Sequence, residues 1–445
     1  MDFALNDEQL EFKAQCRDFA RDVIRPVAAK HDADESTPWE VIKKAREHGL
    51  HGLEHLQRMG SDPDGQLGVI YTEEMHWGCA GIALAISGSS LAAAGLAASG
   101  TPEQIARWVP ECFGLGDEVK LGAYAVTEPQ AGSDVKSMRT TAKLDGEEWV
   151  LNGTKVFITN GGIADVHVVV ATVDPELGHR GQASFVIGRD TPGLRQGKKE
   201  TKIGIRASHT AEIVLEDCRI PVENLLGGID KLNRKLERAR SGESSGRASN
   251  ALATFELTRP LVGSSALGIA QAAYEWTLGY LANGAHAVDP FESALDESST
   301  AGEPPLRRQA NQQVLAQVAT EIEAARLLVQ RAAWMGRNGH PMIGGQGSMS
   351  KLKAGQVAVA ATRQLMDLVG PYAQSADCPL EKWFRDAKIY ELFEGTAEIQ
   401  RLVISRMQAA DYAERLRDAA ELAAPASGPA NGDAVKAAAE ELAAT

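Results

Sequence analysis

The sequence predicts an α+β fold in three parts: an N-terminal helical domain over residues 1–120, a middle β domain over 121–226 and a C-terminal helical domain over 227–415. Apolar residues recur at helical spacing in the first and last parts, whereas β-rich runs separated by turn residues fill the middle part. A chain of 445 residues is also too long for one ordinary core, which favours several domains.

The N-terminal part begins with a helix start signal at Asn6, whose side chain can cap the first turn. The apolar positions of that helix are Leu10, Phe12, Phe19 and Val23. Residues 81–100, GIALAISGSSLAAAGLAASG, are nearly apolar on every side. This run predicts a buried helix.

The middle part contains EEWVLNGTKVFITNGG at residues 147–162, in which two β-rich runs flank Asn152 and Gly153. An Asn-Gly pair between such runs predicts a hairpin with its turn at those two residues. Residues 166–173 and 211–220 predict further strands of the same domain.

Helical spacing returns in the C-terminal part, at residues 263–282, 310–334 and 351–370. A basic segment, 227–249, and an acidic one, 286–305, interrupt it, and we expect both to be solvated insertions or mobile loops. The Ala- and Pro-rich residues 416–445 are predicted to form a flexible tail.

Composition excludes several classes of function. The net charge of −14 argues against nucleic-acid binding, which needs clustered Lys and Arg. We identify no signal peptide and no apolar run long enough to span a bilayer, so we expect no membrane insertion. Five cysteines without CxxC spacing predict buried free thiols in a reducing cytosol, with no metal site. The predicted location is therefore cytoplasmic.

Three motifs carry candidate chemistry. YAVTEPQAGSDV (124–135) runs from a strand end into a turn whose N–H groups and hydroxyls, at Thr127 and Ser133, can approach an anionic ligand. VFITNGG (156–162) places Phe157 and Thr159 on a strand. RDAKIYELFEGTAEIQR (385–401) sets Glu394 beside a glycine at a break between helices. Taken singly, the three also fit an ordinary loop, a half-buried strand and an exposed turn.

Together with KIGIRAS (202–208), LEDCRIPVENLLG (215–227) and FELTRP (255–260), these motifs resemble the acyl-CoA dehydrogenase family, in the family's order over about residues 5–412. The resemblance implies an N-terminal α-helical domain, a middle β-barrel or sandwich domain and a C-terminal four-helix bundle. It also implies FAD-dependent dehydrogenation of an acyl-CoA to a trans-2-enoyl-CoA, as in fatty acid β-oxidation.

The resemblance assigns the catalytic base to Glu394, which would remove the α-proton while a hydride passes to flavin N5. Some members carry the base in the FELTRP segment, where this chain has Thr258. Gly395 permits a tight chain path, and Thr396 can cap the following helix, with Glu398 in its first turn. The backbone N–H of Glu394 and an FAD hydroxyl would stabilise the enolate oxygen.

Further contacts follow from the same resemblance. The implied FAD contacts are Tyr124, Val126, Thr127, Ser133, Phe157, Thr159, Gln309, Thr396 and Glu398. The implied substrate contacts are Ser133, Phe255, Arg259 and Gly395.

The chain departs from the family where many members contact the FAD of a neighbouring subunit. An Arg-x-x-Phe-Gly motif that follows Tyr280 in the family is replaced by Gly284, Ala287 and Val288. The family's Gly-Gly-x-Gly segment reads VGPYA at residues 369–373.

These departures leave three hypotheses open. The chain forms a homo-oligomer, a dimer or tetramer, in which Arg307 or Arg308 rebuilds the FAD contacts; it is a subunit of a heteromeric dehydrogenase; or it is a non-catalytic or repair-associated relative. Electron-transferring flavoprotein is the implied electron acceptor, with direct oxidation by O₂ as the alternative.

Overall fold

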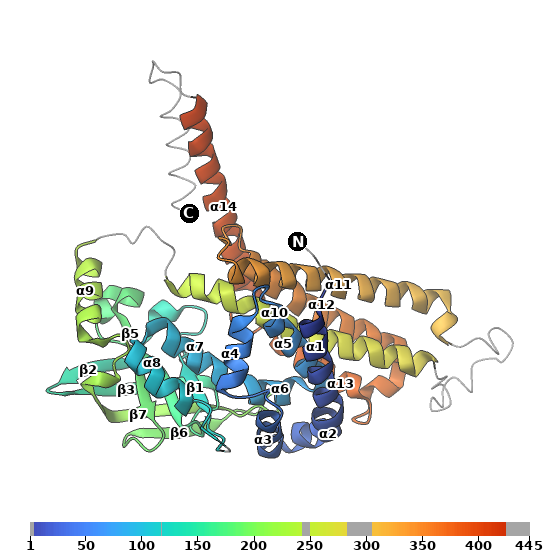
Figure 1. The fold of residues 1–445 in the computed structure, drawn as a ribbon, viewed down its shortest axis with the longest axis horizontal. Helices are drawn as coiled ribbons and strands as arrows, with labels where there is room; N and C mark the ends of the chain where they lie inside the picture. The colour runs from blue at the N-terminus through green and yellow to red at the C-terminus, as the bar shows by residue number, and fades with distance from the viewer. Residues whose placement is uncertain (1–3, 117, 243–249, 283–304, 424–445) are drawn as a thin grey trace. The chain divides into compact units, whose positions relative to one another are not determined.

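The computed structural model describes residues 4–116, 118–242, 250–282 and 305–423 (Figure 1). They form two compact units. The first consists of residues up to Asp62 and from Glu74 to Asn250, and the second of Pro63–Glu73 and residues from Ala251 onward. Along the chain, helices precede a sheet and helices follow it, which confirms the predicted order.

The helices before the sheet are α1 (Asp7–Phe19) with a π-helical continuation (Ala20–Ile24), α2 (Arg25–Asp34), α3 (Trp39–Glu47), α4 (Leu53–Ser61), α5 (Gln66–Gly78), α6 (Ala80–Ser87), α7 (Ser89–Ser99) and α8 (Pro102–Glu111). The predicted cap at Asn6 is confirmed. Its side chain accepts from the Gln9 N–H at 2.9 Å, and the Gln9 side chain accepts from the Asn6 N–H at 3.1 Å. Each side chain thus satisfies an N–H that the helix itself leaves unpaired.

The apolar run at 81–100 forms two helices, α6 and α7, joined at Gly88, instead of one. By length and composition alone, Ala80–Ser99 could cross a membrane, so the expectation that no apolar run is long enough was wrong. More than half of this stretch, 56%, is buried inside the protein. Core helices pass the same test, so the stretch is weak evidence for a membrane span.

The middle part is a seven-stranded sheet of β1 (Gly122–Ala125), β2 (Thr141–Asp145), β3 (Glu148–Thr159), β4 (Val166–Thr172), β5 (Gln182–Gly188), β6 (Leu194–Lys199) and β7 (Thr210–Pro221). The strand order is β1-β4-β2-β3-β7-β6, with β5 also paired to β4. All seven residues of β4 are buried, as expected for a central strand. Trp149, Leu151 and Phe185 lie in the core beneath the sheet.

The predicted hairpin turn at Asn152 and Gly153 was wrong. Strand β3 runs through both residues, and β2 and β3 are joined at residues 146–147, where Gly146 has φ 65°. A Cβ atom at Gly153 would lie 2.4 Å from the Thr140 Oγ1. This glycine therefore permits close packing and a register shift inside a strand.

The basic segment 227–249 was expected to be a solvated insertion or mobile loop, but it contains helix α9 (Gly228–Arg240). Ile229, Leu232 and Leu236 pack against the core of the sheet. Their spacing places them on one face of the helix, with the charged residues elsewhere. Helix α9 thus groups with the first compact unit, although residue 227 was the predicted start of the C-terminal domain.

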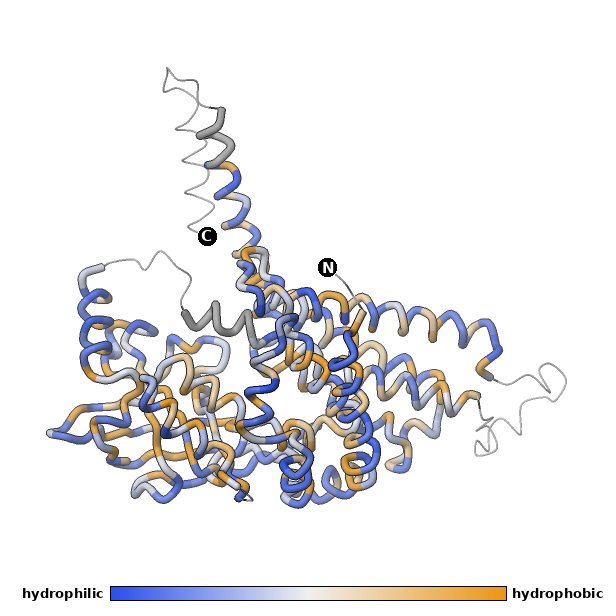
Figure 2. The backbone as a smooth tube through the Cα atoms, viewed as in Figure 1, coloured by the Kyte–Doolittle hydropathy of each residue, from blue (hydrophilic) through white to orange (hydrophobic). Residues whose placement is uncertain are grey.

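The second unit contains α10 (Asn250–Ala282), a 3₁₀ turn (Pro305–Arg307), α11 (Gln309–Arg337), α12 (Gln346–Val369), a 3₁₀ segment (Gly370–Gln374), α13 (Pro379–Ile389) and α14 (Ala397–Ala423). Helix α12 packs against α11, α13 and α14. Figure 2 shows hydrophilic and hydrophobic residues alternating along α11, which has one buried face. Helix α14 extends eight residues into the predicted flexible tail, whereas 424–445 and most of the acidic segment 286–305 lie outside the described residues.

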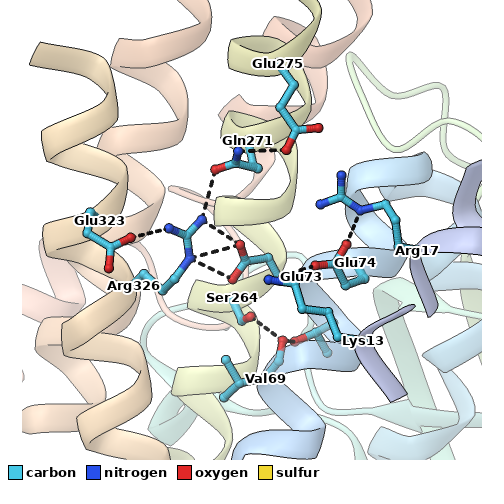
Figure 3. A network of polar contacts seen from close by, with 11 residues as sticks. Lys13, Arg17, Val69, Glu73, Glu74, Ser264, Gln271, Glu275, Glu323 and Arg326 are labelled. Carbon is cyan, nitrogen blue, oxygen red and sulfur yellow. Dashed lines mark hydrogen bonds and ion pairs between the residues drawn. The ribbon is translucent and has the colours of Figure 1, made fainter. Parts of the chain in front are cut away.

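The residues of α5 up to Glu73 group with the second unit. A polar network around Arg326 of α11 joins them to its helices (Figure 3). The Arg326 guanidinium donates to both oxygens of the Glu73 carboxylate, from Nη2 to Oε1 at 2.7 Å and from Nε to Oε2 at 3.3 Å. The Ser264 hydroxyl donates to the Val69 carbonyl at 2.7 Å. Bidentate Arg–carboxylate pairs fix geometry as well as charge, so α5 is held to α10 and α11 at this point.

All five cysteines are buried and free, which confirms the predicted buried thiols.

Candidate active site

Glu394 lies in the turn between α13 and α14, in a backbone conformation that non-glycine residues rarely adopt. Its φ is 54°, and that of Gly395 is 88°. A bulky residue at positive φ is strained, and such strain persists only where the surrounding structure enforces it. The predicted break between helices is confirmed, and the carboxylate sits at its most constrained point.

Two buried side chains hold this turn. The Gln400 Nε2 donates to the carbonyls of Glu394 at 3.2 Å and of Gly395 at 3.0 Å. The Lys351 Nζ donates to the same Gly395 carbonyl at 2.7 Å. Gly395 itself has φ 88°, which strains any residue with a Cβ atom, and a Cβ there would also lie 2.6 Å from the Gln400 Nε2, so the turn favours glycine. Sequence reasoning missed Lys351 and Gln400, although a lysine within the apolar helical pattern after residue 350 was a usable signal.

The start of α14 agrees with the predicted cap. The Thr396 Oγ1 accepts from the Ile399 N–H at 3.3 Å, and Glu398 lies exposed in the first turn. An acidic first turn complements the positive end of the helix dipole. The cap fixes where α14 begins and therefore where Glu394 is placed; the predicted FAD contacts of Thr396 and Glu398 stay predictions.

Burial raises the pKa of the Glu394 carboxyl, while the positive charges of Lys351 and Arg259 act against that rise. Arg259 is itself buried on α10, and its Nη1 donates to the Ser348 Oγ at 2.6 Å. A raised pKa makes a carboxylate a stronger proton acceptor than a free one. Among the described residues, no acceptor lies within hydrogen-bond reach of the Glu394 N–H, so this donor is available to a ligand.

In the first unit, the two sheet motifs meet at the ends of β1 and β3. The Val156 N–H donates to the Thr127 carbonyl at 2.9 Å, which ties the turn after β1 to β3. The next residue, Phe157, has φ 57° and is 64% exposed, and the β3 register shifts between Lys155 and Ile158. The irregularity turns an aromatic ring out of the sheet instead of into its core.

A buried ion pair joins β3 to the turn after β1, next to Phe157. The Lys155 Nζ donates to Glu128 at 2.8 Å and to the Val126 carbonyl at 2.9 Å, and both side chains are almost fully buried. The Glu128 carboxylate also accepts from the N–H groups of Arg139 at 2.7 Å and Thr140 at 2.9 Å. Desolvation would raise the pKa of Glu128, but these hydrogen bonds outweigh it and lower the pKa to about 2.

The residues at this end of the sheet fit a flat, polar-edged ring. Phe157 offers an exposed aromatic face, and the half-buried hydroxyls of Thr127 and Thr159 have no hydrogen-bond partner within the described part of the chain. The half-buried Tyr124 ring packs directly on α7, where a Cβ atom at Gly95 would lie 2.7 Å from it. An aromatic face with unpaired hydroxyls beside it can hold a flat ring that has polar edges.

The remaining predicted residues are placed as follows. Val126 presents its carbonyl to Lys155, and Ser133 lies exposed in the following loop. Gln309 is the exposed first residue of α11, and Phe255 lies within residues 250–257 of α10, the part of this helix whose side chains are outside the described structure.

An aromatic stack includes Tyr372 of the segment VGPYA (369–373). The Tyr372 ring stacks on Tyr280, with ring centres 5.8 Å apart, and Tyr280 stacks on Trp276 at 5.1 Å. Gly284, Ala287 and Val288 lie outside the described residues.

Comparison with known proteins decides the family. Three family models match the chain in order: acyl-CoA dehydrogenase N-terminal domain at residues 6–114, middle domain at 123–218 and C-terminal domain at 248–409. The chain belongs to the acyl-CoA dehydrogenase family. This family is flavin-dependent in general, and acyl-CoA dehydrogenation is the reaction class of this oxidoreductase.

Relatives cover most of the chain. It is 38% identical over 392 residues to the mitochondrial short-chain specific acyl-CoA dehydrogenase of Bos taurus, across 88% of this chain and 87% of that protein. The solved butyryl-CoA dehydrogenase of Megasphaera elsdenii is 31% identical, with a TM-score of 0.76 over 91% of this chain and 98% of that one. A solved structure described as the electron transferring flavoprotein of Acidaminococcus fermentans gives 32% and 0.77, over 91% of this chain and 99% of that one.

Proposed function

We propose that this acyl-CoA dehydrogenase uses FAD to convert a short acyl-CoA to its trans-2-enoyl-CoA, with Glu394 as the catalytic base. The observation that carries the proposal is the Glu394 turn, in which a desolvated carboxylate is held at positive φ by Lys351 and Gln400. Strain fixed by buried side chains at a carboxylate is typical of a residue that acts on a ligand.

The chemistry needs a base and an oxyanion donor. The α C–H of a thioester is a weak acid, so its proton leaves only to a positioned base while the carbonyl oxygen gains charge. Glu394 takes that proton, and its own free N–H donates to the forming enolate oxygen. When bound, FAD accepts the hydride that leaves the β-carbon.

The proposed cofactor contacts are on the sheet. Phe157 would offer its aromatic face to the flavin ring, and the hydroxyls of Thr127 and Thr159 would bond to the polar edge of that ring. Tyr124 and the backbone of Val126, which Lys155 fixes, complete that side. Two relatives, a short-chain specific acyl-CoA dehydrogenase and a butyryl-CoA dehydrogenase, support a short acyl group as the substrate. We propose an electron-transferring flavoprotein as the electron acceptor, as the resemblance to the family implies.

A flavin spectrum of the purified chain, followed by anaerobic titration with acyl-CoAs of increasing length, tests the proposal. We expect bound-flavin absorption that bleaches most completely with short acyl groups. Failure of every acyl-CoA to bleach a bound flavin would contradict the dehydrogenase assignment and favour the non-catalytic relative. Rapid recolouring by O₂ alone would favour an oxidase.

The same preparation separates the two oligomer hypotheses. We propose a homo-oligomer, so the chain expressed alone should retain FAD. A chain that purifies without flavin, and binds it only when mixed with a related subunit, would instead be one half of a heteromeric enzyme.

Thr127→Ala and Thr159→Ala are expected to shift the reduction potential and the absorption spectrum of the bound flavin while the first unit stays folded. Each change removes a hydroxyl that has no other partner among the described residues. Thr154→Ala, in the same strand, is the matched control and should leave the potential unchanged. If all three variants kept the wild-type potential, Thr127 and Thr159 would be ordinary strand residues.

A further inference from the structure

Lys351 is a buried cation that the proposed chemistry does not yet use. It lies near the start of α12 and is only 2% exposed. Its Nζ donates to the Gly395 carbonyl, one residue from the Glu394 carboxylate. A lysine loses its hydration when it is buried, which is costly unless its charge meets a compensating partner.

The neighbouring Gln400 shows that a neutral side chain can hold the backbone of this turn. Its Nε2 donates to the same Gly395 carbonyl and to that of Glu394. A neutral amide therefore satisfies these backbone groups without the cost of a buried charge. The hydrogen bond alone does not explain why residue 351 is a charged lysine, so the positive charge must have another role.

The charged groups around Lys351 indicate what this role is. Burial lowers the pKa of Lys351, and among the surrounding charges Glu394 raises it most, ahead of Glu391 and Glu398, whereas Arg259 on α10 lowers it further. Glu391 is already paired with Lys388 at 2.6 Å, and Glu398 is fully exposed in the first turn of α14. On the α11 side of the same helix, Lys353 pairs with Glu321. Glu394 is thus the half-buried carboxylate on which Lys351 has the strongest electrostatic effect.

The pKa shifts of Lys351 and Glu394 both fit an effect of the Lys351 charge on the Glu394 carboxyl. Burial lowers the pKa of Lys351 to about 8, so the side chain remains a cation in neutral and mildly acidic solution. Burial raises the pKa of Glu394, and Lys351 is the largest influence that lowers it again. A nearby cation favours the ionised form of a carboxyl, which is the form that accepts a proton.

We propose that Lys351 is a positioning residue for proton abstraction: its ammonium fixes the Gly395 carbonyl and keeps Glu394 ionised at the working pH. The proposal rests on the assignment of Glu394 as the base. Lys351 does two tasks, holding the backbone and setting the charge, whereas Gln400 does only the first. The two residues therefore give separable effects.

The test is the pH dependence of flavin reduction by acyl-CoA in the holoenzyme, for Lys351→Met, Lys351→Arg and Gln400→Met. Loss of the cation raises the pKa of Glu394, so in Lys351→Met the acidic limb of kcat/KM should move to higher pH by about one unit. That displacement makes the rate at a pH below both limbs about tenfold lower. Lys351→Arg keeps the charge and should restore the wild-type limb. Gln400→Met should lower the rate while leaving the limb in place.

A folded Lys351→Met that keeps the wild-type acidic limb would overturn the proposal. Lys351→Gln is a second neutral variant if the Met variant does not fold, with the same expected displacement. Lys351→Arg provides an independent test. If the acidic limb of kcat/KM moved up by a full pH unit in this charged variant, the proposal would be contradicted.

Glu394→Gln is measured in parallel to separate the two assignments. If Glu394→Gln is inactive while the neutral Lys351 variants keep the wild-type limb, only the role of Lys351 fails. If Glu394→Gln reduces flavin at the wild-type rate, the base assignment itself fails.

Discussion

Glu394→Gln is expected to keep the fold and the flavin content of the protein while removing nearly all of its activity. Glutamine has almost the same shape and preserves the backbone contacts to Lys351 and Gln400, because those contacts use carbonyl groups of the turn. It cannot accept the α-proton, and a positioned general base contributes about 10²–10⁴-fold in rate. The measurement is the rate of flavin reduction by the best acyl-CoA under anaerobic conditions.

Glu381→Gln is the matched control for this experiment. Glu381 is a partly buried carboxylate on α13 that pairs with Arg385 at 2.8 Å, outside the Glu394 turn. Its neutralisation should leave flavin reduction close to the wild-type rate. Equal rates for the wild type and Glu394→Gln would show that another group removes the proton.

Lys155→Met should cause the largest loss of stability, about 3–5 kcal/mol in the free energy of unfolding, because it leaves a buried carboxylate without its cation. Glu128 would keep the N–H groups of Arg139 and Thr140 but lose its only ion-pair partner among the described residues. The Val126 carbonyl would also lose its donor, so we expect weaker FAD retention. Urea unfolding of the flavin-free protein measures the first effect without the contribution of ligand binding.

Lys198→Met is the control for burial. Lys198 pairs with Glu200 at 3.0 Å, but its side chain is 67% exposed, and exposed pairs contribute about 0–1 kcal/mol. The two lysine variants should therefore differ clearly in their unfolding midpoints. Equal losses would mean that the Glu128–Lys155 pair contributes no more than a surface contact.

Local sequence signals predicted local structure well. The Asn6 cap, the break at Glu394 and the cap at Thr396 each depend on residues within a few positions of one another, and the structure confirms all three. Where a signal was ambiguous, packing decided. Asn152-Gly153 is a common turn pair, yet the chain continues as β3 because Thr140 lies against the glycine and β7 pairs along the strand.

The basic segment containing α9 shows a second case in which the sequence did not predict the structure. The charge of this segment suggested a solvated loop. A helix can, however, be charged on one face and apolar on the other, and the apolar face of α9 packs against the core of the sheet. That face contacts residues of β strands many positions earlier in the chain. Composition averages over the charged and the apolar face of a helix, so it did not predict α9.

By itself, the sequence determined the order of helical and sheet parts, the family and the identity of the candidate base, because these depend on periodicity and on motifs of neighbouring residues. The tertiary structure alone decided what controls that base. Lys351 and Gln400 reach the Glu394 turn from different helices, and Lys155 reaches Glu128 across 27 positions. Burial sets the charge state of such groups, and burial is a property of the packed chain, so no local pattern could predict it.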